Sequence, residues 1–474
     1  MKVTLVYPGI AQIGFDSLGK GTPNTHLVGL GLASLGASIK EKTSHTVDLI
    51  DLREMKSWSH FSETLDSRKC DLVGLYVNTV NYTFALKCAE IAKGLHKRVI
   101  GGGPHATIAP TDLLDTGLFD HVVTGEGEIT FPKILDEIES GKEVDRMVQG
   151  ETVTDLDELP IPDRDLYNMK AILGSSGISP YPHRYIGILT SRGCPFNCAF
   201  CQPLEKILFG RKVRQRSVPN VMREVEFVRD RYKANFIMFQ DSVLTIRKEW
   251  VQDLCQQMGQ TGILWGCQTR VDAVDEDTIR AMKHGGCAVI MFGFESGSDR
   301  ILKVLGKNTT KEQALEAARL CKKYGIMVFA NYMLGVPTET TEDLEATLDL
   351  LKKIKPEIHA QSCFSPIPGS YLYDYCKGRD LIVADGYEAF ARSAFERKIK
   401  GIDYAALGPM RKRMESWKTP WYRHRTYTRC MLSRWNALLR EGFFFQTVKE
   451  VLLSIPVIER PLKMAAQALK GRPG

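Results

Sequence analysis

The stretch Thr190–Gln202 reads TSRGCPFNCAFCQ and contains three cysteines, Cys194, Cys198 and Cys201, in a C-x3-C-x2-C spacing. A short loop of this kind can turn three thiolates toward one soft metal centre. Three protein ligands leave one iron of a four-iron cluster open, and an open iron can bind a cofactor or a substrate, much as a catalytic zinc keeps one position open. The spacing therefore predicts a [4Fe–4S] cluster held by these three cysteines.

Other uses of the three cysteines stay open at this point. Zinc would need a fourth ligand, and His183 is the only histidine close by in the sequence. A disulfide would leave one cysteine over, and buried structural cysteines would not need a Gly-Cys-Pro turn. The chain has 12 cysteines that are otherwise thinly spread, which differs from a small secreted disulfide scaffold and fits a reducing compartment.

From Tyr185 onward, six short apolar runs alternate with helical patterns. The predicted strands are Tyr185–Thr190, Phe236–Phe239, Leu264–Gln268, Ala288–Phe294, Val328–Leu334 and Ile358–Phe364. The predicted helices are Pro219–Tyr232, Lys248–Met258, Glu276–His284, Lys311–Tyr324 and Thr341–Ile354. Six such units are too many for another simple open sheet and too few for a closed eightfold barrel, so we expect a partial (β/α)6 barrel with active residues at the carboxyl ends of its strands.

The first 130 residues or so show the same alternation. Continuous apolar strands separated by amphipathic helices indicate parallel strands buried on both faces, so this part predicts an open, doubly wound sheet of the Rossmann or flavodoxin type. The predicted strands are Val3–Pro8, Val47–Leu52, Leu72–Val77, Val99–Gly103 and His121–Gly125. The clearest predicted helices are Leu27–Ile39 and Thr83–Leu95.

These patterns divide the α/β chain into four parts. Residues 1–142 form the doubly wound domain, and 143–180 form a linker that carries the acidic, proline-containing stretch ETVTDLDELPIPDRD. Residues 181–376 form the barrel. Residues 377–474 form a helical, basic C-terminal region, because the strand and helix alternation stops near residue 376.

The barrel resembles the radical S-adenosylmethionine (SAM) enzymes from Tyr185 to about Tyr375. Phe200 supplies the aromatic residue before the last cysteine, and four later stretches resemble the family's second to fifth units: FQDSVLT (239–245), CQTRVDAVDEDTIRAMKHGGC (267–287), GFESGSDRILKVLGKNTT (293–310) and GVPTET (335–340). In that family the open iron binds the amino and carboxylate groups of SAM. One electron then breaks the S–C5′ bond and yields a 5′-deoxyadenosyl radical.

The resemblance implies that several residues besides Phe200 lie near SAM. Asp241 matches the second-strand motif, although Ser242 stands where the family often has a second Asp. Arg270 would pair with the methionine carboxylate, and Glu295 would bind a cationic or hydroxyl group of SAM. Gly335 would line the adenine site. The structural alternatives are an ion pair within the barrel for Arg270, a solvated strand end for Glu295 and a plain turn for Gly335.

The doubly wound domain has its glycines late in the sheet. RVIGGGPHATIAP (98–110) and GEGE (125–128) follow the fourth and fifth strands, and Asn78-Thr79 follows the third, whereas the first loop, YPGIAQIG (7–14), lacks a nicotinamide motif. Together with PNTHLVGLGLASLGASI (23–39), this arrangement resembles the cobalamin-binding domain of B12-dependent radical SAM enzymes. The implied cobalamin contacts are Asn78, Thr79, Gly102, Gly103, His105, Gly125, Glu126 and Gly127.

One motif of many cobalamin domains is missing from the sequence. D-x-H-x-x-G, whose histidine ligates cobalt from below, does not occur after the first strand. The resemblance therefore implies cobalamin with its dimethylbenzimidazole tail displaced and no histidine beneath the metal. His105 is expected to contact the loop or the tail.

Positive charge gathers at the C-terminal end of the chain. Residues 411–474 hold 14 Lys and Arg against 4 Asp and Glu, a difference of +10, whereas the whole chain carries +7. The stretch WKTPWYRHRTYTRCMLSRWNALLREGFFF (417–445) mixes Trp, Tyr and Arg. A helical cap that shapes the substrate pocket is the favoured interpretation; an anionic membrane surface comes second and nucleic acid is least favoured.

The resemblance implies an enzyme that methylates an unactivated carbon of a small-molecule or lipid-like substrate, with a one-electron reductant such as flavodoxin or ferredoxin. A cobalamin-dependent cyclisation, ring contraction or oxidation is the first alternative, and a non-catalytic cobalamin or iron–sulfur sensor is the second. No apolar run reaches the roughly 18 residues of a membrane-spanning helix, and no signal peptide is recognisable. We expect a cytoplasmic protein with possible peripheral membrane contact.

Overall fold

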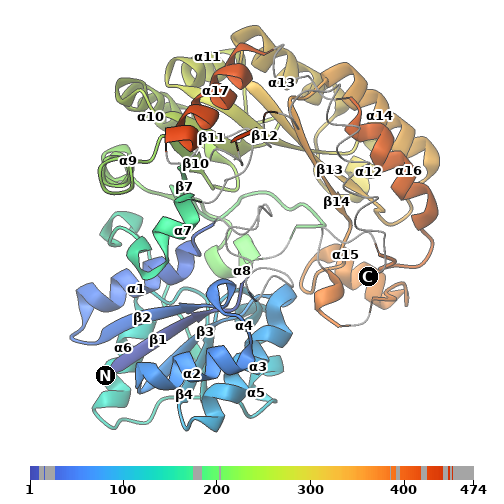
Figure 1. Cartoon of the computed structure of the whole chain (residues 1–474). Coiled ribbons are helices and arrows are strands. Elements are labelled where there is room, and N and C mark those ends of the chain that lie inside the picture. The colour runs from blue at the N-terminus through green and yellow to red at the C-terminus, as the bar shows by residue number, and fades with distance from the viewer. Residues whose placement is uncertain are drawn as a thin grey trace.

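Two six-stranded parallel sheets form the framework of the computed structural model, and helices lie against both (Figure 1). The structure describes residues 1–9, 15, 27–174, 184–201, 204–384, 386–390, 396–417, 424–440, 447–448 and 451. His183, the neighbouring zinc ligand considered from the sequence, lies outside these residues.

The N-terminal sheet has the order β2-β1-β3-β4-β5-β6. Its strands are β1 Lys2–Tyr7, β2 Thr46–Asp51, β3 Leu72–Tyr76, β4 Arg98–Gly102, β5 His121–Thr124 and β6 Met147–Gln149. Its helices are α1 Leu30–Lys42, α2 Trp58–Arg68, α3 Tyr82–Gly94, α4 Pro104–Ile108, α5 Pro110–Leu114 and α6 Thr130–Glu139. The order reverses between β1 and β3, which is the point where open α/β sheets bind ligands. This confirms the predicted doubly wound fold.

The sixth strand, β6, falls inside the range predicted as a linker. It pairs parallel with β5, with Val122 opposite Met147 and Thr124 opposite Gln149. Three residues without a buried face show no alternation of apolar and polar residues, so no pattern in the sequence predicts this strand. The chain between β6 and the barrel then forms short turns and α7, Met169–Gly174.

The second sheet curls into the expected half-barrel, with strands adjacent in chain order (Figure 1). They are β7 Tyr185–Ile188, β10 Phe236–Phe239, β11 Leu264–Thr269, β12 Cys287–Glu295, β13 Met327–Leu334 and β14 Ile358–Cys363. The helices outside the sheet are α9 Val218–Tyr232, α10 Lys248–Thr261, α11 Glu276–His284, α13 Lys311–Tyr324 and α14 Thr341–Ile354. Their ends follow local signals: the side chain of Thr310 caps the first turn of α13, and Gly325 ends that helix in a left-handed conformation.

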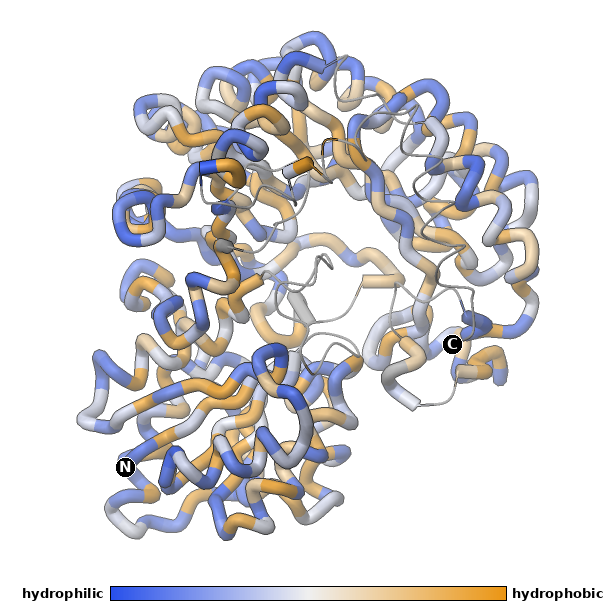
Figure 2. Tube along the Cα trace, viewed as in Figure 1, coloured by the Kyte–Doolittle hydropathy of each residue, from blue (hydrophilic) through white to orange (hydrophobic). Residues whose placement is uncertain are grey.

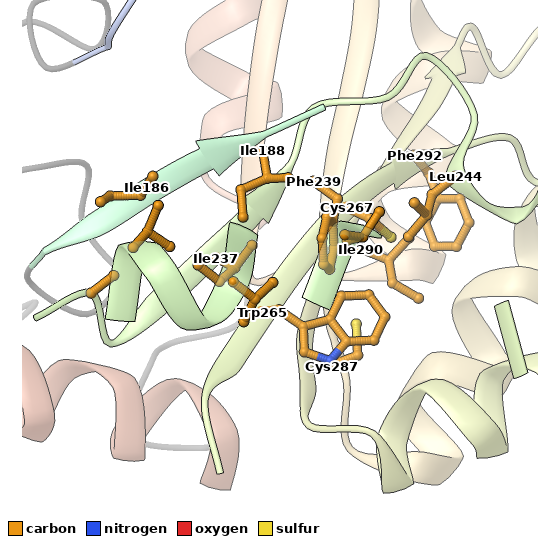
Figure 3. Close-up of a cluster of buried hydrophobic side chains, with 14 of the residues drawn as sticks. Ile186, Ile188, Ile237, Phe239, Leu244, Trp265, Cys267, Cys287, Ile290 and Phe292 are labelled. Carbon is orange, nitrogen blue, oxygen red and sulfur yellow. The ribbon is translucent and has the colours of Figure 1, made fainter. Parts of the chain in front are cut away.

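The barrel core lies between the sheet and its outer helices. Figure 3 shows side chains from several strands meeting there, among them Ile237, Phe239 and Trp265. The Trp265 indole N–H is buried and donates to the carbonyl oxygen of Gly285 over 2.6 Å. Figure 2 shows apolar strands flanked by helices of mixed hydropathy, the pattern from which the barrel was predicted.

Helix α15, Tyr371–Gly378, crosses the predicted end of the barrel at residue 376, and the described part of the C-terminal region then forms α16 Tyr404–Glu415 and α17 Arg425–Arg440. Helix α16 packs beside α14 and buries Leu407, Met410 and Met414 in the barrel core. Helix α17 inserts Cys430 into an apolar cluster with Tyr185 of β7 and buried residues of β10, β12 and β13. Both helices thus pack on the barrel, and α17 does so at the beginnings of the strands, so the role of a cap that shapes the substrate pocket stays a prediction. None of the described helices is long and apolar enough to cross a membrane.

Candidate functional site

The three cysteines lie in the loop between the two strands of a short antiparallel hairpin at the mouth of the half-barrel. Strands β8 (Ser191–Arg192) and β9 (Arg214–Gln215) pair at the base of the loop that carries Cys194, Cys198 and Cys201. Gly193 leaves β8 with φ +96°, and a Cβ there would lie 2.7 Å from the Lys212 carbonyl oxygen. Only glycine can therefore make the turn into the loop without displacing the backbone.

Backbone hydrogen bonds fix the middle of this loop to the rest of the barrel. The N–H of Ala199 donates to Leu305 over 2.8 Å, and its carbonyl accepts from the N–H of Leu372 over 3.0 Å. The N–H of Cys201 donates to the Cys198 carbonyl over 3.2 Å, which forms a turn between these two cysteines. Helix α12, Asp299–Val304, and helix α15 thereby support the cysteine loop.

None of the three cysteines is in a disulfide; Cys194 and Cys198 are half-buried and Cys201 is exposed. Within the described ranges, no three His, Cys, Asp or Glu side chains lie close enough together to hold a metal ion. The three sulfur atoms therefore lie on one loop but are not close enough together to bind a common metal centre. Since metal binding and the ordering of ligands are coupled, a cluster would draw them together by side-chain rotation in an already anchored loop.

Asp241, predicted near SAM, is fully buried behind this loop. One carboxylate oxygen accepts hydrogen bonds from the Thr190 N–H over 3.1 Å and from the Thr190 hydroxyl over 2.9 Å. The Ser191 hydroxyl donates to the same oxygen. Burial raises the pKa of Asp241, and these donors oppose the rise. The carboxylate thus fixes the strand end that leads into the cysteine loop.

Arg270 follows β11 and reaches the cysteine loop. Its guanidinium donates to the Cys198 sulfur over 3.5 Å and lies 3.8 Å from the centre of the Phe196 ring. The same group forms an ion pair with Asp272 and donates to the carbonyl oxygen of Lys307 over 2.7 Å. The ion pair considered as the structural alternative exists, and it aims the cation at a cysteine ligand.

Glu295 ends β12 with φ +62°, a left-handed conformation that is rare for a residue with a side chain. Its carboxylate forms a buried ion pair with Lys307, whose Nζ lies 2.7 Å from Oε1. The Lys307 ammonium also lies 5.9 Å from the centre of the Phe200 ring. Glu295 is therefore held toward the barrel mouth by a paired charge and is not a solvated strand end.

Sequence reasoning missed Lys307, Asp272 and Phe196. Lys307 lies in the stretch that resembles the fourth unit, and Asp272 lies two residues after Arg270. Phe196 stands between the first two cysteines. Lys307 and Asp272 could have been found because each lies close in sequence to a predicted site residue of opposite charge.

Gly335 leaves β13 with φ +78°, and its N–H donates to Glu339 over 2.6 Å. Burial raises the pKa of Glu339 to about 8, which two backbone N–H donors only partly oppose. This carboxyl group closes the turn after β13 and was not predicted from the sequence.

A cavity of about 310 Å³ lies between the N-terminal sheet and the base of the cysteine loop. Of the residues predicted to contact cobalamin, those that line it are Gly102, Gly103, Gly125, Glu126 and Gly127. A Cβ at Gly31 would meet nothing within 4 Å, and one at Gly102 would meet only the Val123 carbonyl oxygen at 3.8 Å. Because these two residues are glycines without side chains, the cavity has room for a ligand. The barrel side of the cavity includes Arg192 and Phe209.

Asn78, Thr79 and His105 are not among the residues that line this cavity. Asn78 caps the short helix that begins at Thr79, and the Thr79 hydroxyl lies 3.3 Å from Nδ1 of His105. The His105 ring contacts the rings of Tyr82 and Tyr387, each 4.8 Å away between centroids, and the two tyrosine rings lie 5.3 Å from each other. Burial lowers the pKa of His105, and nearby Asp112 opposes this. These residues hold the C-terminal segment 386–390 against the N-terminal domain.

Glu126 and its neighbour Glu128 form ion pairs with arginines of the hairpin. Glu126 pairs with Arg192 at 3.1 Å and Arg214 at 2.7 Å, and Glu128 also pairs with Arg192. Burial alone would raise the pKa of Glu126, but the two arginines hold it below its usual range. The predicted GEGE segment thus contacts both the cavity and the base of the cysteine loop.

Comparison with known proteins agrees with this two-part site. The profile of the Radical SAM superfamily matches residues 188–351, and that of the B12 binding domain matches residues 20–135. An uncharacterized methyltransferase of Pyrococcus horikoshii is 32% identical over 410 residues, 82% of this chain and 86% of that protein. The anaerobic magnesium-protoporphyrin IX monomethyl ester cyclase of Rubrivivax gelatinosus is 26% identical over 79% of this chain and 69% of its own length.

A solved structure has the same fold. The radical SAM methyltransferase TsrM from Kitasatospora setae, determined with a tryptophan substrate and a SAM analogue, superposes with a TM-score of 0.68. The match covers 88% of this chain and 89% of TsrM at 16% sequence identity. At that identity the likeness concerns the fold.

Proposed function

The chain belongs to the cobalamin-binding radical SAM enzymes, and from that premise we propose that it methylates an unactivated carbon of a small-molecule or lipid-like substrate. Its cofactors are a [4Fe–4S] cluster, SAM and cobalamin. The observation that carries the proposal is the cavity of the B12 domain, which opens against the base of the cysteine loop. A methyl donor and a radical source would thus stand on facing surfaces.

The residues present fit both groups. The cavity has glycines where side chains would project into it, as Gly31 and Gly102 show, and its described lining contains no histidine. This agrees with cobalamin bound without a histidine beneath the metal. Cys194, Cys198 and Cys201 supply three soft thiol donors on one anchored loop, which suits an iron–sulfur cluster with an open iron.

When bound, the reduced cluster and SAM supply a 5′-deoxyadenosyl radical, and methylated cobalamin supplies the methyl group. The protein contributes orientation and exclusion of water. Asp241 holds the strand end before the cysteines, and Arg270 places a cation beside Cys198. Phe200, Glu295 and Gly335 are the residues that we propose to contact SAM. A reductant such as flavodoxin or ferredoxin delivers the electron, and Cys201 lies on the exposed side of the loop.

The described C-terminal helix α17 supports a lipid-like substrate and peripheral membrane contact. Its outward face carries Leu432 and Leu439, which are 53% and 47% exposed and lie seven residues apart, so they share one face. Arg429 and Arg440 are exposed on the same helix, and its 16 residues include no acid. Such a face suits an anionic bilayer. Cosedimentation with phosphatidylglycerol vesicles, compared with phosphatidylcholine vesicles, tests this contact.

Relatives with other activities keep a second candidate open. The Rubrivivax gelatinosus relative is named a cyclase, so a cobalamin-dependent cyclisation or oxidation is the competing function. The sensor hypothesis predicts that SAM is not cleaved after reduction.

The test uses the anaerobically reconstituted full chain with hydroxocobalamin, dithionite, methyl-tritiated SAM and fractionated cell extracts. Methyl transfer predicts equal amounts of S-adenosylhomocysteine and 5′-deoxyadenosine and tritium in an extract component. Formation of 5′-deoxyadenosine with no S-adenosylhomocysteine in any fraction would exclude methylation and favour the cyclase-like reaction. A Cys198→Ala variant controls for cluster-independent breakdown of SAM.

A further inference from the structure

The hairpin whose loop carries the cysteines forms ion pairs with buried carboxylates on both sides. In this hairpin Ser191 pairs with Gln215 and Arg192 pairs with Arg214, so the two arginines stand side by side. Arg192 lies two residues before Cys194. Any shift of the hairpin would therefore move the cysteine loop with it.

The N-terminal domain holds the cysteine-proximal side of this hairpin through two carboxylates. Oε1 of Glu126 accepts from Arg192 over 3.1 Å and from Arg214 over 2.7 Å, while its Oε2 accepts from Arg214 over 2.9 Å. Glu128 accepts from the other Arg192 nitrogen. Glu126, Glu128 and Arg192 are 3%, 6% and 8% exposed, so the network is shielded from solvent. Forked arginine–carboxylate contacts of this kind fix direction as well as distance.

The barrel holds the other side of the hairpin in the same way. Arg216, directly after β9, pairs with the fully buried Glu224 of α9 and donates to the Leu189 carbonyl over 3.0 Å. Glu224 also pairs with Arg164 from the segment that joins the two domains. With Asp241 holding Thr190 and Ser191, the hairpin is clamped between the two domains by carboxylates.

The carboxylates on the N-terminal side also touch the cobalamin cavity. Glu126 and Glu128 flank Gly127, and all three residues line the cavity together with Arg192. One buried network therefore borders the cobalamin site at one end and the cysteine loop at the other. An apolar contact could hold the domains together, but it would not fix one orientation as forked ion pairs do.

We propose that Glu126 and Glu128 are positioning residues that, through Arg192 and Arg214, set the distance between the [4Fe–4S] cluster and the cobalt of cobalamin. The inference deepens the proposed function and rests on it, because methyl transfer needs a substrate carbon to reach both centres. A displacement of about 1 Å can cost a reaction about 100-fold in rate. The GEGE segment thereby sets the distance between the two cofactors in addition to binding cobalamin.

The test measures this geometry without a substrate. Full-length protein is reconstituted with iron and sulfide, loaded with hydroxocobalamin and reduced, so that the cluster and cob(II)alamin are both paramagnetic. Pulsed electron paramagnetic resonance then measures how strongly the cluster accelerates spin relaxation of the cobalt. The variants are Glu126→Gln/Glu128→Gln and Arg192→Lys, which keeps the charge and loses the fork. Arg231→Gln is the matched control, since its ion pair with Asp165 is exposed.

The wild type and Arg231→Gln are expected to give one uniform relaxation enhancement. The double variant and Arg192→Lys are expected to lose that uniformity and give a broad range of cluster–cobalt distances, with iron and cobalamin still bound. If the double variant fails to retain cobalamin, Arg192→Lys decides the question. An enhancement in Arg192→Lys identical to that of the wild type overturns the proposal. A wild type with uniform coupling that forms no S-adenosylhomocysteine would instead refute methyl transfer alone.

Discussion

The guanidinium of Arg270 donates a hydrogen bond to the sulfur of Cys198 over 3.5 Å. Asp272 and the carbonyl oxygen of Lys307 hold the guanidinium from behind, and the Phe196 ring covers one of its faces. A cation beside a ligating thiolate offsets the extra negative charge of a reduced cluster. Hydrogen bonds to cluster sulfurs are among the features that set reduction potential.

Replacing Arg270 with Gln is therefore expected to make the cluster harder to reduce. A charge-assisted hydrogen bond is worth about 1.5–3 kcal/mol, so loss of this one predicts a one-electron potential about 65–130 mV more negative. Potentiometric titration of the reconstituted protein, followed by electron paramagnetic resonance, measures the shift. Arg319→Gln is the control because its ion pair with Glu316 is exposed on the surface of α13. Equal potentials for the two variants would contradict this role.

Filling the cavity at Gly102 is expected to abolish cobalamin binding and spare the cluster. A Cβ at this position lines the cavity and meets only the Val123 carbonyl oxygen at 3.8 Å, so the branched side chain of Gly102→Val occupies volume that the ligand needs. Hydroxocobalamin titration followed by absorbance should show the loss, with iron content unchanged. Gly94→Val, at the end of α3 where a Cβ meets no atom within 4 Å, should bind as the wild type does. Normal binding by Gly102→Val would place cobalamin elsewhere.

Removing one partner of the Lys307–Glu295 ion pair is expected to destabilise the fold more than removing both charges. Both side chains are nearly buried, so Lys307→Met leaves an uncompensated carboxylate and is expected to cost about 3 kcal/mol. The double variant Lys307→Met/Glu295→Gln removes that charge and should recover part of the loss. Thermal unfolding of the apo chain measures both. Equal losses in the single and double variants would show that the pair contributes through packing only.

Glu339 predicts a specific pH dependence. Its folded pKa is about 8, above the 4.5 of an ordinary glutamate. Between these values the folded state binds more protons than the unfolded state, so the contribution of Glu339 to stability falls as pH rises. Glu339→Gln removes this term. The melting temperature of the variant relative to the wild type should therefore increase from pH 5 to pH 8, and a constant difference would refute the raised pKa.

Local signals explain why so much of the barrel could be predicted. Helices α11, α13 and α14 begin and end at the predicted residues, because capping side chains such as Asp275 and Thr310 mark their first turns. Strand β6 could not be predicted, since its three residues gain their conformation from pairing with β5. The start of α1 also differs, because Leu30 follows Gly29, which provides no capping side chain.

The sequence by itself determined the order of the two domains, the half-barrel and the loop that carries Cys194, Cys198 and Cys201. These features depend on periodicity and on spacing along the chain, which are local. Only the tertiary structure decided where the side chains point. It turned Glu126 toward Arg192 and Arg214, which are 66 and 88 residues away, and it buried His105 beneath Tyr387. Such contacts depend on how the domains pack, and no local pattern encodes that packing. The cysteine loop can thus be recognised from the spacing of its residues, whereas the ion pairs that hold it in place arise only from the packing of the two domains.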